Sequence, residues 1–123
     1  ISINDAYNSN PIGFAAALDV LDVLKRDGKR YLITPGMVEL GETHDLEHSK
    51  LGAMAANKAD IILAVTPDRI PTFVEAAKNG SAEVRCFDTQ DEAQLWLNTH
   101  ITPADVVLYE NNLPDLYEAK VSF

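Results

Sequence analysis

The chain has 123 residues, a single cysteine, 46% hydrophobic and 24% charged residues, and a formal net charge of −9 at neutral pH. This length fits one domain with a hydrophobic core of its own. The acidic balance argues against nucleic acid or an anionic membrane surface as a partner, because phosphate binding requires clustered Lys and Arg. No apolar run approaches the length of a bilayer span, which argues against membrane insertion, and no signal-peptide pattern is present. We therefore expect a cytoplasmic protein.

Short apolar runs typical of strands alternate with helical patterns along the whole chain. Within one of these runs lies Cys86, which we expect to be a buried, inert thiol. Strands are expected at 1–3, 31–33, 60–65, 83–87 and 105–109, with a sixth, edge strand at 119–123.

The helices are predicted from their starting signals and apolar spacing. Asn10 is placed to cap a helix that begins at Pro11, and Thr89 with Glu92 forms a capping box before another helix. A helix is also expected over about 43–58, and one after Thr66-Pro67, which repeats the order of cap and proline. Strands that alternate with helices imply right-handed βαβ crossovers. The pattern predicts an α/β fold: one Rossmann-like three-layer domain with a mainly parallel sheet of about six strands.

Polar side chains cluster directly after the first expected strand, at Asp5, Tyr7, Asn8 and Ser9. Open α/β sheets hold their ligands at the carboxyl ends of the strands, although such a cluster also suits an ordinary polar turn. No Gly-x-Gly-x-x-Gly follows the strand, which argues against a dinucleotide cofactor, and no Gly-x-x-x-x-Gly-Lys-Ser/Thr loop is present to hold phosphates. The cluster is a candidate ligand site without a phosphate-binding loop of its own.

Two segments carry a resemblance to a known family. Asp5, Tyr7, Asn8, Asn10 and Pro11 fit the pattern Asp-x-Tyr-Asn-x-Asn-Pro, and 35–42 resembles Gly-Asp-Met-x-Glu-Leu-Gly-Glu with Pro-Gly in place of Gly-Asp. Both patterns are typical of the C-terminal domain of the Mur ligases, in particular the branch that adds D-alanyl-D-alanine to the UDP-muramoyl tripeptide. The resemblance covers the whole chain, strongly up to about Ala59 and by pattern afterwards.

The resemblance implies the function of an ATP-dependent amide-bond ligase in peptidoglycan precursor synthesis. Residues 1–123 would form its acceptor-binding domain, while the N-terminal and central ATPase domains would lie outside this chain, which begins within a strand and has no initiator Met. ATP and Mg²⁺ would be held mainly by the central domain. The partners would be a UDP-sugar peptide, an amino acid or dipeptide acceptor, and the ligase's own central domain. We expect the isolated chain to be inactive, with no catalytic residue of its own.

The same resemblance suggests which residues touch ligand. Asp5 would accept hydrogen bonds from the nucleotide ribose, and Tyr7 would either pack against the base or anchor the turn. The loop that includes Met37 and Glu39 would follow a strand lying beside the first one and so face the same crevice, where Glu39 is either an attraction for the acceptor ammonium group or a solvated acid. The implied contacts with nucleotide are Asp5, Tyr7 and Asn8, and those with the acceptor are Ser9, Met37, Glu39, Asn111 and Asn112.

The segment after the fifth expected strand departs from the family pattern. The D-alanyl-D-alanine-adding branch typically has Lys-Gly-Ser here, whereas this chain has Asn111 and Asn112 followed by Leu-Pro-Asp. The two amides suit a neutral or amidated acceptor, and the alternative is a proline-containing turn that contacts no ligand. The identity of the acceptor is therefore open.

Three other interpretations fit parts of the sequence. His44 and His48 stand four residues apart in a formal zinc-protease pattern, but no motif supplies a third ligand, so we expect a solvated helix start and no metal site. A non-catalytic α/β module that binds a small metabolite is the main alternative to a ligase domain. A receiver domain fits poorly, because Asp68 is not well placed to accept a phosphoryl group. A Gly-Thr-Asn-Gly-Lys-Thr-type loop upstream of Ile1 in the parent gene would favour the ligase.

Overall fold

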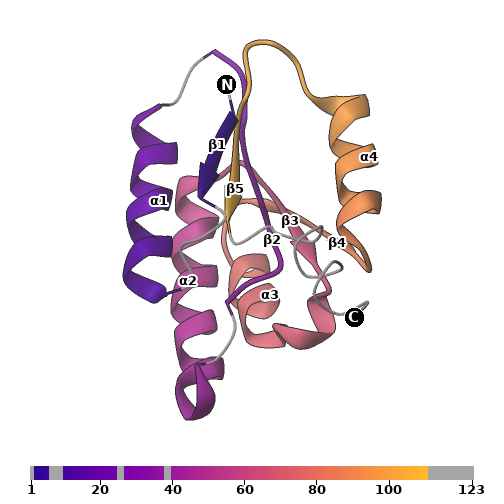
Figure 1. Cartoon of the computed structure of the whole chain (residues 1–123). Coiled ribbons are helices and arrows are strands. Elements are labelled where there is room, and N and C mark those ends of the chain that lie inside the picture. The colour runs from indigo at the N-terminus through magenta and orange to yellow at the C-terminus, as the bar shows by residue number, and fades with distance from the viewer. Residues whose placement is uncertain (1, 6–9, 25–26, 38–39, 111–123) are drawn as a thin grey trace.

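The computed structural model describes residues 2–5, 10–24, 27–37 and 40–110, with positions 4 and 5 by their backbone alone. Within these ranges the centre is a parallel sheet of five strands, where about six were expected over the whole chain, and the predicted fold class is confirmed (Figure 1). The sixth strand, expected at 119–123, lies outside the described residues. The strands are β1 (Ser2–Asp5), β2 (Arg30–Thr34), β3 (Ile61–Val65), β4 (Glu83–Phe87) and β5 (Val106–Glu110).

The order of the strands is β1-β5-β2-β3-β4, so β5 separates β1 from β2. The expectation that the first two strands are neighbours is wrong. Val106, Val107 and Leu108 of β5 are fully buried, as an apolar strand requires when it has a neighbour on each side and helices over its faces. The first crossover passes over one strand position, and the last strand fills that position.

In the described part of the chain, four α-helices cover the two faces of the sheet (Figure 1). Three crossovers lead from β1 towards β4 and place α1, α2 and α3 on one face. The connection from β4 back to β5 runs in the opposite direction, so a right-handed crossover places α4 on the other face. The helices are α1 (Pro11–Val23), α2 (His44–Lys58), α3 (Pro71–Lys78) and α4 (Gln90–His100), with short 3-10 turns η1 (Gly41–Thr43) and η2 (Pro67–Arg69).

The helix expected over about 43–58 is present as α2, and two of the three predicted N-caps are confirmed. The Asn10 side chain accepts a hydrogen bond from the Gly13 amide at 2.8 Å, and Thr89 and Glu92 form the reciprocal capping box. The third is wrong, because Thr66 adopts a left-handed conformation (φ 49°) and makes no side-chain cap bond. The chain turns through η2 first, and α3 begins four residues later at Pro71.

Two hydrophobic cores lie on opposite faces of the sheet. The larger one includes Phe14 and Phe73, both fully buried with ring centroids 6.1 Å apart, and the smaller one packs the other face against α4. Cys86 belongs to neither core and is exposed, so the expectation of a buried thiol is wrong. Its strand, β4, lies at the edge of the sheet, and three of its five residues are exposed.

The amino ends of the central strands are joined by ionic and polar contacts. Arg30 forms two side-chain hydrogen bonds to Asp60, at 3.2 and 3.1 Å, and pairs with Asp22 at 2.5 Å. Asp60 raises the pKa of the Arg30 guanidinium above its ordinary value. The buried Asp105 carboxylate accepts from the amides of Lys29 and Thr102, each at 2.7 Å. These contacts tie the amino ends of β2, β3 and β5 to one another and to α1.

No helix within the described ranges is both long and apolar enough to cross a membrane.

Candidate functional site

The carboxyl ends of three adjacent strands form the candidate site. In the register of the sheet Asp5 of β1 lies opposite Glu110 of β5, and Ile33 of β2 lies opposite Tyr109 of β5. The three segments singled out in the sequence therefore begin at neighbouring strand ends, with the segment after β5 in the middle. Parallel strands bring distant parts of the chain together at one edge in this way.

The predicted site residues differ in what the structure describes. Asp5 is the last residue of β1, and its backbone stands at this edge. Met37 is described in full. The remaining residues, Tyr7, Asn8, Ser9, Glu39, Asn111 and Asn112, lie outside the described residues.

The loop after β2 is held by hydrogen bonds to its backbone. The Gly36 amide donates to the Thr34 hydroxyl at 3.0 Å, and the Met37 amide donates to Nε2 of His48 at 2.9 Å. Arg69 donates from Nη1 to the Met37 carbonyl at 2.8 Å and from Nη2 to the carbonyl of residue 35. Two distant elements, α2 and η2, therefore fix the path of this loop. We call this arrangement of His48, Arg69 and residues 35–37 the loop clamp.

Met37 is a core residue in this arrangement. Its side chain is fully buried and packs within the larger core, while its amide and carbonyl are both engaged in the loop clamp. The described groups of Met37 thus fix the backbone directly before residue 38.

His48 is fully buried, so the expectation of a solvated histidine is wrong at this position. Its Nδ1–H donates to the His44 carbonyl at 2.7 Å, and its Nε2 accepts from the Met37 amide. These two bonds select the neutral ring with its proton on Nδ1. Burial is the main cause that lowers the pKa of His48 below its ordinary value. The hydrogen bond to the His44 carbonyl acts against burial, whereas the charges of His44 and Arg69 act with it.

The start of α2 is also tied to the turn before α3. The His44 ring lies against the His48 ring with centroids 4.1 Å apart, and its Nε2 lies 2.9 Å from the Arg69 carbonyl oxygen. The Thr72 hydroxyl donates to the Asp45 carbonyl at 2.8 Å. Among the described residues, no three His, Cys, Asp or Glu side chains gather as a metal site. The four-residue spacing of the histidines serves hydrogen bonding between elements.

Two residues of the site had no distinct signal in the sequence. Arg69 lies in a turn that reads as an ordinary polar connection. Glu110 ends the apolar run of β5 and is fully buried, in register with Asp5. The only signal for Glu110 was its position. It is an acid at the carboxyl end of a buried strand, and the neighbouring strand β1 also ends in an acid, Asp5.

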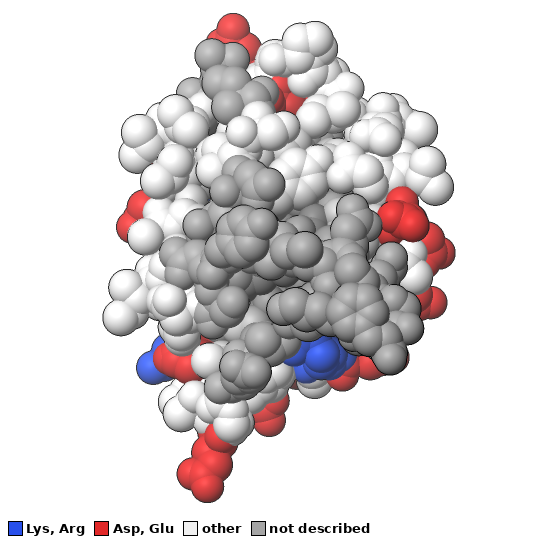
Figure 2. Space-filling model, viewed as in Figure 1, with Lys and Arg blue, Asp and Glu red and all other residues white. Residues whose placement is uncertain are grey.

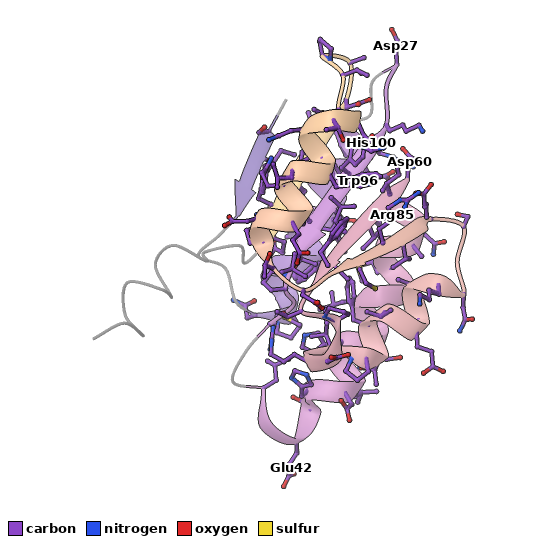
Figure 3. All side chains as sticks on the ribbon, turned by 90° about the vertical axis from the view of Figure 1, so that its right-hand side faces the viewer. Asp27, Glu42, Asp60, Arg85, Trp96 and His100 are labelled. Carbon is purple, nitrogen blue, oxygen red and sulfur yellow. The ribbon has the colours of Figure 1, made fainter. Side chains whose placement is uncertain are left out.

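Charge is distributed unevenly on the surface. Acidic side chains outnumber basic ones among the coloured residues of the face in Figure 2. Glu42, from the second family motif, is exposed in η1 and points outward at the far end of the molecule from Asp27 (Figure 3). Arg85 lies 5.0 Å from the centre of the Trp96 ring, whose other contacts include a stack with His100. Neither the exposed Glu42 nor the contact between Arg85 and Trp96 brings several basic side chains together, as phosphate binding would require.

The architecture is a parallel α/β domain in which the carboxyl ends of β1, β5 and β2 lie side by side. The model of the Mur ligase, glutamate ligase domain family matches residues 1–110. The chain belongs to this family, as a Mur ligase C-terminal domain. The match favours a ligase domain over a non-catalytic metabolite-binding module.

Several relatives agree with this assignment. The UDP-N-acetylmuramoyl-tripeptide–D-alanyl-D-alanine ligase of Bacillus subtilis (strain 168) is 32% identical over 79 residues, which cover 64% of this chain and 15% of that protein. The MurF ligase of Thermotoga maritima in complex with ADP matches with a TM-score of 0.65 and 26% identity, over 85% of this chain and 23% of that chain. A structure of MurF from Acinetobacter baumannii matches with a TM-score of 0.67 and 26% identity, over 96% and 27%. This chain thus spans less than a third of each relative.

Proposed function

We propose that this chain is the acceptor-binding domain of an ATP-dependent amide-bond ligase that acts in peptidoglycan precursor synthesis in the cytoplasm. The observation that carries the proposal is the family match over residues 1–110, because it includes all three strand ends of the crevice. The N-terminal and central ATPase domains are supplied by other parts of the same ligase. ATP phosphorylates a carboxylate of the UDP-sugar peptide, and the amine of the acceptor then attacks the acyl phosphate.

The charge of the domain supports the assignment of ATP binding to another domain. With a formal net charge of −9, the domain has little means of its own to hold triphosphate. The described residues offer neither a metal cluster nor a Gly-rich phosphate loop. We therefore assign the ATP phosphates and Mg²⁺ to the central domain. This domain contributes positioning, since it brings the amine and the acyl phosphate together where water is excluded.

The proposed ligand contacts follow from the three strand ends. Asp5, with Tyr7 and Asn8, contacts the nucleoside part of ATP when the domain closes over the central domain. Ser9 and Glu39 contact the acceptor, and Met37 acts by fixing the loop that carries Glu39. Asn111 and Asn112 complete the acceptor site from the end of β5, which lies between β1 and β2.

We predict that the acceptor is neutral or amidated at its far end and differs from free D-alanyl-D-alanine. A dipeptide has a free carboxylate, and the family's usual lysine would give it a charge-assisted hydrogen bond of about 1.5–3 kcal/mol. Asn111 and Asn112 offer amide donors and acceptors instead, and Glu110 adds a buried acid at this strand end.

The test is an ATP-turnover assay of the full-length ligase with D-alanyl-D-alanine, its C-terminal amide, and a panel of amino acids. We expect the strongest saturable stimulation from an uncharged acceptor, and a higher KM for that acceptor in Asn111→Ala or Asn112→Ala. Stimulation by D-alanyl-D-alanine alone, unaffected by either substitution, would contradict the predicted acceptor. Absence of ATP-dependent ligation with any acceptor would contradict the proposed function itself.

A further inference from the structure

The loop clamp joins residues 35–37 to a single titratable ring, that of His48. The Met37 amide, immediately before Val38 and Glu39, donates to Nε2 of His48 at 2.9 Å. The other ring nitrogen already donates its proton to the His44 carbonyl at 2.7 Å. A second proton on the ring would therefore have to sit on Nε2, where it would face the Met37 N–H. Two donors cannot share that contact, so protonation breaks the bond.

The His48 ring is closely surrounded. His48 is fully buried, and a Cβ added to Gly36 would lie 2.8 Å from its Nε2 and 2.6 Å from a methyl carbon of Ile70. The ring therefore packs directly against the loop backbone. A side chain held this closely passes any loss of its hydrogen bond on to the loop.

We propose that His48 is a positioning residue of the acceptor site: its neutral ring holds the loop after β2 in place, and protonation releases that loop and weakens acceptor binding. The proposal rests on the proposed function for its ligand, whereas the link between His48 and Met37 is a property of this chain alone. Arg69 completes the clamp at the Met37 carbonyl and keeps its charge at every relevant pH.

The groups that face His48 set the direction of its pH dependence. On α2 these are His44 and Asp45, and on η2 it is Arg69. Burial disfavours the protonated ring most strongly, and the charges of His44 and Arg69 add to that effect. The hydrogen bond to the His44 carbonyl and the Asp45 carboxylate favour the protonated ring but do not outweigh burial, so the pKa lies below its ordinary 6.5. The clamp is then intact above about pH 6.5 and is lost as the pH falls through the lowered pKa. The unfolded chain, with its ordinary histidine, binds the proton more readily, so the domain also loses stability in that acidic range.

The first measurement is a pH titration of the ¹⁵N-labelled chain by NMR. We expect the Nδ1-protonated, neutral tautomer of His48 at pH 7.5, and we expect the Met37 amide shift and its hydrogen exchange to change with the same midpoint as His48. His48→Gln places an amide oxygen near the position of Nε2 without a titrating ring, so the Met37 transition should disappear. In the matched control, His100→Gln on the exposed stack of α4, the transition should remain. A Met37 amide that ignores the titration of His48 would overturn the proposal.

The second measurement uses the full-length ligase. His48→Leu removes the ring nitrogen that accepts the Met37 N–H. We expect the KM for the amine substrate to rise about five- to fifteenfold at pH 7.5, which is the effect of one lost hydrogen bond, while the KM for ATP stays unchanged. His48→Gln should restore most of that loss and flatten the acidic rise of KM seen in the wild type. An equal rise of KM with acidity in the wild type and His48→Gln would overturn the proposal. A ligase inactive towards every acceptor would contradict the proposed function, and the NMR titration would still decide the clamp.

Discussion

Replacement of Asp5 by alanine is expected to lower the turnover of the full-length ligase by roughly 30- to 1,000-fold, which corresponds to about 2–4 kcal/mol. Asp5 ends β1 and lies in register with Glu110 at the proposed crevice. A carboxylate that accepts hydrogen bonds from ribose hydroxyls makes contacts that alanine cannot replace. The fold should be retained, because the backbone pairing of β1 with β5 does not depend on this side chain.

The measurement is steady-state kinetics with saturating UDP-sugar peptide and acceptor while ATP is varied. Asp88→Ala is the matched control. Asp88 is an exposed acid that directly follows the carboxyl end of β4, and β4 is separated from the proposed crevice by β3. Its turnover should match the wild type. Normal kinetics in Asp5→Ala would mean that Asp5 only forms the turn.

Gly36→Ala is expected to lower the free energy of unfolding by about 2–5 kcal/mol and to disrupt the loop clamp. Gly36 has a φ of +83°, which costs an alanine about 1–2 kcal/mol. The added Cβ would also come within 2.6 Å of Ile70 and 2.8 Å of His48, and relief of such overpacking costs a further 1–3 kcal/mol or so. Denaturant unfolding, followed by circular dichroism, measures the loss.

Gly41→Ala separates the two causes. Gly41 also has a positive φ, of +58°, but an added Cβ there meets no atom within 4 Å. This variant should lose only about 1–2 kcal/mol, and the Met37 amide should keep the His48-dependent shift that Gly36→Ala loses. Equal losses in the two variants would mean that the crowding around Gly36 is relieved at no cost and that backbone conformation alone matters.

Local hydrogen bonding made part of the fold predictable. The Asn10 cap and the Thr89–Glu92 box each involve residues three positions apart, so the sequence contains both partners of each bond. Buried strands such as Ile61–Val65 were also recognisable as continuous apolar runs. The place of β5 between β1 and β2 was not predictable, because it depends on pairing between residues about a hundred positions apart.

The sequence indicated which strand ends carry the candidate site residues, but it did not indicate how the loop after β2 is held. The family motifs placed ligand residues after the first, second and fifth strands, and these strands prove to be neighbours. The role of His48 depends on where the loop after β2 passes and on a guanidinium that arrives from η2, and no local spacing encodes either. Cys86 shows the same limit: its apolar run fits a core strand or an edge strand, and tertiary position decides between them.

The most direct test of the central claim compares the intact ligase with a form that lacks residues 1–123. Both are given ATP, Mg²⁺, the UDP-sugar peptide and the acceptor panel, and amide product and ADP are quantified by mass spectrometry. We predict acceptor-dependent product with one ADP per amide bond in the intact ligase. The shortened form should still bind ATP but make no amide product, because the acceptor has no site. Product formation at the intact rate without these residues would contradict the assignment of acceptor binding to this domain.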